Sequence, residues 1–159
     1  MSLDRDISLL SRVSLFGELT TEQLRLLAFS AVRLELTAGQ VLFREGAKAH
    51  SGYIVAFGGL ELVTGEGRAR KVLATCEIGS LLGEIALFVE TERPATAIAV
   101  VSSEVLEIDR KLVTRMLNEY PHVALRLRAT LSERLGATVA ELGKVRQALQ
   151  AIDRRSARR

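Results

Sequence analysis

The chain carries three successive patterns of hydrophobic positions, and each pattern predicts a different kind of structure. Across residues 5–30 the apolar side chains recur at helical spacing, and Gly17 divides the stretch into two short predicted helices. Thr20, followed by Gln23, is typical of a capped N-terminus for the second helix. Across residues 32–108 the apolar period changes to two, the period of β-strands. The chain is therefore expected to begin with helices and continue with strands.

The predicted strands are short and closely spaced along the middle of the chain. Glycines punctuate them, and Gly65-Glu66-Gly67 is predicted to form the tip of a hairpin, because glycine tolerates positive φ there. Many short strands with frequent turns favour an antiparallel β-roll, a double-stranded arrangement like a jelly roll. The expected strands are Val32–Leu36, Val41–Phe43, Tyr53–Phe57, Leu60–Leu62, Val72–Ala74 and Val105–Ile108.

The apolar period returns to that of a helix from Arg110 onward. A short amphipathic helix is predicted to end near Tyr120, and Pro121 suits the first turn of a following helix that reaches about Ile152. Positions of this long helix recur at alternating spacings of four and three, which is the seam of a coiled coil. The seam either pairs with a second copy, which is the expectation here, or lies along the chain's own β-roll. The seam residues are Leu131, Leu135, Thr138, Leu142, Val145, Leu149 and Ile152.

These patterns predict a mainly β protein with flanking helices in one domain, which a chain of 159 residues accommodates. The domain is expected to span residues 1–153. N-terminal helices would occupy 1–31, the β-roll 32–109, and the hinge helix and the long C-terminal helix 110–153. Residues 154–159 are expected to be a basic, disordered tail.

Composition and charge narrow the class of protein. Aromatic residues make up 4% of the chain and Trp is absent, so the core is expected to be aliphatic. The formal net charge of +3 comes from residues 153–159, so no basic face for nucleic acid is predicted elsewhere. The longest uncharged apolar stretch, Ala95–Ser103, is about half the length of a bilayer span. The amino terminus lacks the layout of a secretory signal, so a cytoplasmic location without a membrane partner is expected.

The numbers of cysteines and histidines argue against metal and disulfide chemistry. Cys76 is the single cysteine, which excludes an intrachain disulfide and a four-cysteine metal site. His50 and His122 are too few for a multi-histidine centre. An enzyme of the cupin type needs about three clustered histidine or carboxylate ligands. We therefore expect no enzymatic activity, no metal and no cofactor.

One segment, Gly83–Ala97, carries the candidate chemistry. Gly83 allows a close approach of the backbone, and Glu84–Phe88 is long enough for one helical turn with outward-facing N–H groups. Arg93 returns a guanidinium to the same place. Amides at the start of a helix together with an arginine bind one phosphate well. A carboxylate at Glu84 suits a ligand that also offers a hydroxyl, as a ribose does, so a nucleotide is indicated.

The same segment resembles the phosphate-binding cassette of cyclic nucleotide-binding domains, whose pattern is Gly-Glu-x-Ala-Leu, a linker, and Arg-x-Ala-Thr. The resemblance extends over most of the chain. Leu42–Gly46 is similar to the family's early strand and turn, and Tyr53–Gly59 to its central hairpin. Gly79 precedes the cassette, and Arg110 begins the family's hinge helix. The resemblance implies a β-roll that binds a cyclic nucleotide.

The resemblance also implies a role for each matching position of the cassette. Glu84 would accept a hydrogen bond from the ribose 2′-hydroxyl, and Arg93 would pair with the exocyclic phosphate oxygens. The backbone amides of Ile85 and Ala86 would complete the phosphate site. The further residues that would line the site are Gly83 and Ala95.

Two positions bear on recognition of the base. Arg134–Thr138 is similar to a stretch in cAMP receptor protein-like members of the family that ends in a threonine contacting adenine. Pro94 departs from the family, in which Ala, Ser or Thr often follows the arginine, and proline offers no N–H to a phosphate. A threonine there is associated with guanine selectivity, so its absence favours cAMP over cGMP.

We therefore expect a stand-alone regulatory module that senses cAMP, less readily cGMP, and signals by repacking its C-terminal helices. Its expected partners are the nucleotide, a second copy through the long helix, and an unknown downstream protein. Few residues follow Thr138, so the winged helix-turn-helix of the family's transcription factors has no room and direct sequence-specific DNA binding is not expected. The alternative is an interaction or dimerisation module with a vestigial pocket, in which Glu84 pairs with Arg93.

Overall fold

The computed structural model describes residues 3–125, 147 and 149–152. Its α-helices are α1 (Leu3–Ser11), α2 (Thr21–Ser30) and α3 (Arg110–Glu119), and residues 121–125 are also helical. Short 3-10 helices are η1 (Ser14–Phe16), η2 (Gly67–Ala69) and η3 (Glu84–Leu87). The strands are β1 (Val32–Leu36), β2 (Val41–Phe43), β3 (Lys48–Ala49), β4 (Ser51–Phe57), β5 (Leu60–Thr64), β6 (Lys71–Cys76), β7 (Leu81–Leu82), β8 (Thr91–Glu92), β9 (Thr96–Ala99) and β10 (Ser103–Asp109).

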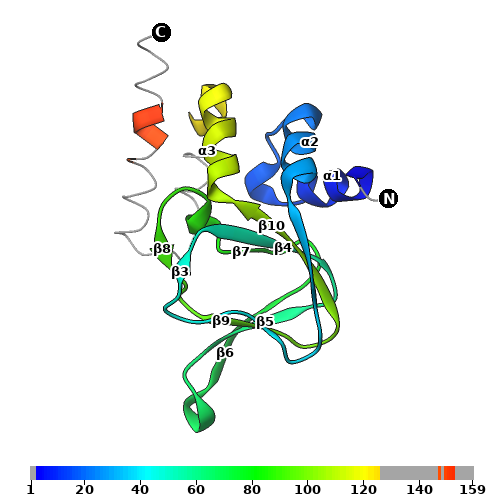
Figure 1. Cartoon of the computed structure of the whole chain (residues 1–159), viewed down its shortest axis with the longest axis vertical. Coiled ribbons are helices and arrows are strands. Elements are labelled where there is room, and N and C mark those ends of the chain that lie inside the picture. Colours follow the sequence, from blue (N-terminus) through cyan, green and yellow to red (C-terminus); the bar gives the residue numbers. More distant parts are fainter. Residues whose placement is uncertain (1–2, 126–146, 148, 153–159) are drawn as a thin grey trace.

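The strands form two four-stranded sheets and one two-stranded pair, all antiparallel. The first sheet has the order β1-β10-β4-β7, the second has the order β2-β9-β5-β6, and β3 pairs with β8. Helices α1, α2 and α3 lie on one side of the first sheet, and the second sheet lies on its other side (Figure 1). The β5–β6 hairpin projects away from the helices. The prediction of a mainly β fold with flanking helices is confirmed.

Strand β4 is buried on both faces because it lies between two apolar clusters. Ile54 packs with the helices in the first cluster, whereas Tyr53 and Val55 belong to the second cluster, between the two four-stranded sheets. Successive side chains of a strand point to opposite faces, so a strand covered on both sides is apolar throughout. Both the helices and the cassette therefore pack against β4.

Several local predictions are confirmed in detail. Thr20 and Gln23 form a capping box at the start of α2: the Gln23 N–H donates to Thr20 Oγ1 at 3.2 Å, and the Thr20 N–H donates to Gln23 Oε1 at 2.9 Å. The six predicted strands are all present. Gly65 has a φ of 76°, as a hairpin tip requires, although the 3-10 helix η2 lengthens the connection beyond the predicted tip.

Strands β3, β7, β8 and β9 were not predicted, for two different reasons. Strands β3, β7 and β8 contain two residues each, which is too few to show a period of two. Strand β9 begins at the end of the cassette segment, directly after Arg93 and Pro94 interrupt the apolar pattern. Both β8 and β9 adjoin Arg93, so the missed strands are the ones that position the candidate site.

Two residues of the predicted coiled-coil seam lie in the described part of the chain, and both pack within it. Leu149 is 2% exposed in the cluster formed by the helices, and Ile152 packs against the same cluster. At these two positions the interpretation in which the helix packs on its own chain is supported. The other seam residues, Thr138 among them, lie outside the described residues, so the long helix and dimerisation through it stay predictions.

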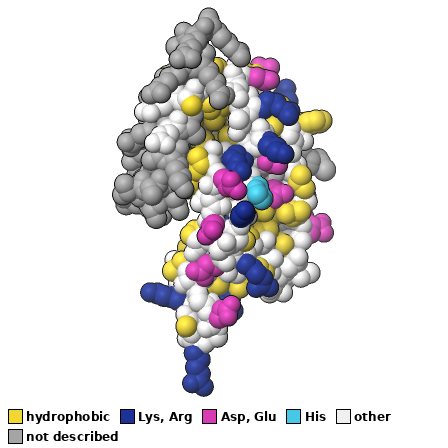
Figure 2. Space-filling model, turned by 60° about the vertical axis from the view of Figure 1, so that its left-hand side comes forward, with side chains coloured by type: hydrophobic (Ala, Val, Ile, Leu, Met, Phe, Trp, Pro, Cys, Tyr) yellow, Lys and Arg dark blue, Asp and Glu magenta, His cyan; other side chains and the backbone are white. Residues whose placement is uncertain are grey.

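In the part of the chain that the structure describes, no helix is both long and apolar enough to cross a membrane. On the face shown in Figure 2, Lys and Arg side chains are interspersed with Asp and Glu side chains and do not form a patch of one sign. This distribution agrees with the balanced charge of the chain outside its last residues.

Candidate functional site

Arg93 lies in the short connection between β8 and β9, and its backbone is fixed by the segment that follows β2. The Arg93 N–H donates to the Ala47 carbonyl at 2.8 Å, and the Gly46 N–H donates to the Arg93 carbonyl at 2.8 Å. Thr96 Oγ1 accepts a bond from the Glu45 N–H at 2.9 Å. Two of the sequence segments that carry the resemblance are therefore joined directly by hydrogen bonds, and the turn after β2 holds the arginine in position.

The Arg93 side chain points into the protein and is 4% exposed. Its Nη2 donates to the Ser51 carbonyl at 2.8 Å. Its Cζ lies 4.3 Å from the centre of the Phe43 ring and 5.3 Å from that of Tyr53, within the range of cation–π attraction. The two rings come from different sheets and stack with centroids 5.8 Å apart. The guanidinium is thus held against a pair of aromatic rings between the sheets.

Nη1 of Arg93 has no hydrogen-bond partner, and it is the one buried side-chain polar atom of which this is true among the described residues. The ion pairs in that part of the chain are those of Arg33 with Asp6 and Glu104, so no carboxylate pairs with Arg93. Burial lowers the pKa of the Arg93 guanidinium, against which Tyr53 and Glu107 act to raise it. A buried cation with an unused hydrogen-bond donor favours the binding of an anion.

Gly83 makes room for this guanidinium. Its φ of 76° places it in the left-handed region, where it turns the chain from β7 into η3. A Cβ at position 83 would overlap Arg93 Nη1. Glycine suits this position for two reasons: its backbone conformation is one that other residues rarely adopt, and it leaves room for the close approach of the arginine.

The short helix η3 begins at Glu84, which is half-buried, and is anchored by the residues at its end. Leu87 is fully buried and rests on Gly52 of β4, where a Cβ would lie 3.1 Å from the Leu87 side chain. Phe88 also joins the cluster formed by the helices. The predicted helical turn is confirmed, and its apolar end belongs to the same core as α3.

The remaining predicted site residues differ in their surroundings. The Ala86 N–H donates to the Gly83 carbonyl at 3.1 Å, so this amide is bonded within the turn and does not face outward as the sequence suggested. Ala95, two residues after Arg93, is buried, whereas Pro94 is exposed. Ile85 is half-buried and packs against the core of the helices. Thr138 lies outside the described residues. Among the described residues, no ion pair joins Glu84 to Arg93, the pair on which the alternative interpretation relies.

Sequence reasoning missed the groups that surround the guanidinium: the Phe43 and Tyr53 rings and the Ser51 carbonyl. A signal for the rings existed, because the chain has only five Phe and two Tyr, and both Phe43 and Tyr53 lie in segments similar to the family. A backbone acceptor leaves no trace in the sequence. No group of three or more His, Cys, Asp or Glu that could hold a metal ion is found among the described residues.

Comparisons with known proteins show the family to which the chain belongs. Residues 33–120 match the family described as cyclic nucleotide-binding domain. The cyclic AMP receptor protein of Thermus thermophilus is 33% identical over 129 residues, which are 80% of this chain and 60% of that protein. A solved structure of a cyclic nucleotide-binding-like protein from Brucella abortus is 44% identical with a TM-score of 0.65, covering 70% of this chain and 97% of that one.

A similarity of another kind is found with a much larger protein. Lysophospholipase NTE1 of Chaetomium globosum is 30% identical over 112 residues, which are 70% of this chain but only 7% of the enzyme. The chain therefore spans a small fraction of that relative and about three fifths of the Thermus receptor. The similarity is to one module of the enzyme.

Proposed function

The chain belongs to the cyclic nucleotide-binding domain family, and from that premise we propose that it is a regulatory module that binds cAMP through Arg93. The observation that carries the proposal is Nη1 of Arg93, a buried donor without a partner on a cation that forms no ion pair with a carboxylate of the described residues. A cyclic phosphate supplies one negative charge and two acceptor oxygens at once. Binding it would satisfy the donor and offset the cost of burying the charge.

The other cassette residues divide the recognition of the ligand between them. Glu84, at the start of η3, accepts a hydrogen bond from the ribose 2′-hydroxyl. Gly83 and Ala95 let the phosphate approach the backbone, and Ile85 and Ala86 contribute amides from the turn. The Ala86 amide is already bonded to the Gly83 carbonyl at 3.1 Å, so the ligand shares or replaces that bond.

Preference for adenine is the finer part of the proposal. Pro94 stands where a threonine accompanies guanine selectivity, and the similarity to the cyclic AMP receptor protein of Thermus thermophilus supports cAMP. Thr138 is proposed to contact the base. Both assignments rest on the resemblance and not on a contact between described residues.

Signalling is proposed to run from the cassette to the C-terminal helices through a shared core. Leu87 and Phe88 at the end of η3 lie in the same buried cluster as Met116 and Leu117 of α3 and Leu149. A movement of η3 toward the phosphate changes the packing surface that α3 rests on. The nucleotide shifts this equilibrium only by its difference in affinity for the two arrangements.

The cellular location and the partners of the module are also part of the proposal. We infer that it acts in the cytoplasm, as a homodimer or on a downstream protein, without catalysis and without direct contact to specific DNA sequences.

A calorimetric titration of the full chain tests the proposal. cAMP is expected to bind more tightly than cGMP, and 5′-AMP, which lacks the cyclic phosphate, is expected to bind weakly. If neither cyclic nucleotide binds at about 100 μM, which corresponds to about 5.5 kcal/mol, the proposal is wrong. Preferential binding of cGMP would overturn only the assignment of adenine as the preferred base.

A further inference from the structure

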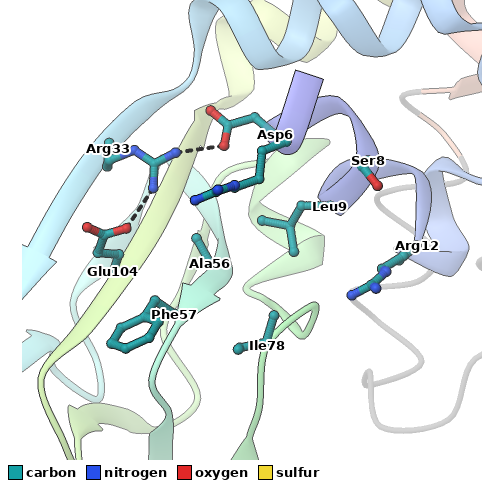
Figure 3. Close-up of a pocket in the computed structure, with 10 residues that line it drawn as sticks. Asp6, Ser8, Leu9, Arg12, Arg33, Ala56, Phe57, Ile78 and Glu104 are labelled. Atoms are coloured by element: carbon teal, nitrogen blue, oxygen red, sulfur yellow. Dashed lines mark hydrogen bonds and ion pairs between the residues drawn. The ribbon is translucent and has the colours of Figure 1, made fainter. Parts of the chain in front are cut away.

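A groove separate from the cassette runs between α1 and the sheet that contains β1, β10 and β4. Its volume is about 520 Å³, and its apolar lining consists of Leu9, Ala56, Phe57 and Ile78. In Figure 3, Arg33 and Glu104 lie on one side of these apolar residues and Arg12 lies on the other. None of the cassette residues lines the groove. A volume of this size is typical of a binding pocket.

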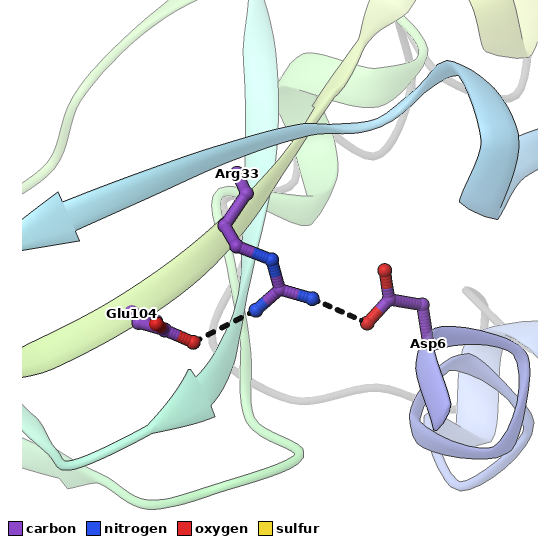
Figure 4. A network of polar contacts seen from close by, with 3 residues as sticks. All are labelled: Asp6, Arg33 and Glu104. Atoms are coloured by element: carbon purple, nitrogen blue, oxygen red, sulfur yellow. Dashed lines mark hydrogen bonds and ion pairs between the residues drawn. The ribbon is translucent and has the colours of Figure 1, made fainter. Parts of the chain in front are cut away.

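The groove lining contains three arginines and two carboxylates, and both carboxylates pair with the same arginine. Arg33 bridges Asp6 at 2.6 Å and Glu104 at 2.8 Å, from α1 to β10 (Figure 4). Arg5 and Arg12 also line the groove and are exposed, and neither has an ion pair within the described part of the chain. The formal charge of the lining is therefore +1, and Arg5 and Arg12 are the two positive groups with which no carboxylate of the lining pairs.

The apolar lining reaches the surface beside these charges. Phe57 is 58% exposed and Ile78 is 51% exposed, although Leu9 beneath them is buried. A large aromatic side chain next to unpaired arginines is the composition of the energetically important part of protein–protein interfaces. Water contact with these two side chains is unfavourable, and covering them would release about 25 cal/mol for each Å² removed from water.

We propose that this groove binds a segment of a partner protein in which acidic residues flank one or two large apolar side chains. The apolar side chains cover Phe57 and Ile78, and the carboxylates pair with Arg5 and Arg12. The chain's own residues 154–159 have the wrong charge for this role, because they contain four arginines and no acidic residue. Nucleic acid fits less well, because its phosphates leave the apolar lining uncovered. The proposal does not depend on nucleotide binding.

Selection from a displayed library of random 12-residue peptides on the immobilised full chain tests the proposal. Enriched peptides are expected to combine Asp or Glu with Leu, Ile, Phe or Trp. Fluorescence anisotropy then compares their affinity for the unaltered chain, for an Arg5→Glu/Arg12→Glu variant, and for Phe57→Ser. Each variant is expected to weaken binding at least tenfold. The matched control is Arg70→Glu, an exposed arginine beside η2 that does not line the groove, which is expected to leave affinity unchanged.

The altered positions are exposed, so circular dichroism is expected to find every variant folded. The proposal is overturned if no acidic and apolar peptide is enriched, or if the enriched peptides bind the groove variants as well as the unaltered chain. Sedimentation velocity tests another occupant: a dimer that Phe57→Ser dissociates would assign the groove to a second copy. Binding to phosphatidylglycerol vesicles that the double arginine variant loses would assign it to lipid. Either result would also overturn the partner-segment proposal.

Discussion

The guanidinium of Arg93 packs directly against Gly83, ten residues earlier in the chain, and a side chain at position 83 would occupy the place of Nη1. Gly83 therefore provides space for the Arg93 side chain, in addition to any space that it provides for a ligand. In this chain, therefore, the glycine and the arginine of the motif depend on each other. This relationship also separates two effects of changing the glycine, backbone strain and displacement of the arginine.

Gly83→Ala is expected to weaken cAMP binding, and Gly79→Ala serves as its matched control. Both glycines have positive φ, 76° and 92°, so each alanine costs about 1–2 kcal/mol of stability. A Cβ at position 79 meets nothing within 4 Å, whereas one at position 83 overlaps Arg93. Loss of one charged hydrogen bond predicts a decrease in affinity of at least about tenfold for Gly83→Ala only. Equal affinities of the two variants in calorimetry would contradict this account of the glycine.

Arg93→Met is expected to abolish nucleotide binding without unfolding the protein. The arginine is buried and has no carboxylate partner among the residues that the structure describes, so an apolar side chain of similar length is expected to leave the free energy of unfolding unchanged or raise it by up to about 2 kcal/mol. Urea unfolding of the nucleotide-free protein measures this. Arg70→Met, at an exposed arginine, should change stability by no more than about 0.5 kcal/mol. If Arg93→Met instead destabilises the fold by several kcal/mol, the arginine is a structural residue. That result would support the alternative of an interaction or dimerisation module with a vestigial pocket.

The Phe43 ring is expected to couple energetically to the Arg93 guanidinium, 4.3 Å away. A double-mutant cycle with Phe43→Leu and Arg93→Met, followed by urea unfolding, should give a coupling energy of about 1 kcal/mol. Tyr53→Phe keeps the second ring and is expected to preserve most of that coupling. A coupling energy within error of zero would mean that the ring packs beside the arginine without stabilising it.

Stability is expected to fall at high pH through Tyr53. Burial raises the pKa of its phenol above the ordinary value near 10, an effect that a hydrogen bond with Ser51 opposes and Glu107 reinforces. Above about pH 10 the unfolded chain loses this proton while the folded protein keeps it, so unfolding becomes more favourable as the pH rises toward the raised pKa. Below that range the contribution is constant.

Urea unfolding of the unaltered chain and of Tyr53→Phe from about pH 8 to pH 11 isolates this contribution, because other groups titrate equally in both proteins. The difference in unfolding free energy between them should be flat up to about pH 9 and then shift in favour of Tyr53→Phe. A difference that is independent of pH would show that the phenol titrates alike in the folded and unfolded chains.

The sequence predicted the parts of the fold and site that depend on local pattern. The capping box at Thr20, the longer strands and the residues of the cassette all have a signature in the residue order. Arg93 was identified from its motif, but its contacts were not. Phe43 and Tyr53 meet it from different sheets, and that encounter depends on how the sheets pack.

Other features had no readable signal or had a misleading one. The Ser51 carbonyl accepts from Arg93, and a backbone acceptor is available at every residue. The Ala86 amide was expected to face outward, but in a turn as short as η3 it reaches back to the Gly83 carbonyl. Leu149 lies on a heptad-like seam, and such a pattern does not distinguish a partner helix from the chain's own core.

The most direct test of the central claim is a crystal structure of the full chain with cAMP. The account predicts a phosphate oxygen within about 2.7–2.9 Å of Nη1 of Arg93, with the guanidinium still packed against Gly83 and Nη2 still bonded to the Ser51 carbonyl. A structure in which cAMP is bound but its phosphate lies elsewhere, with Nη1 still lacking an acceptor, would contradict the assignment of Arg93 as the anion receptor.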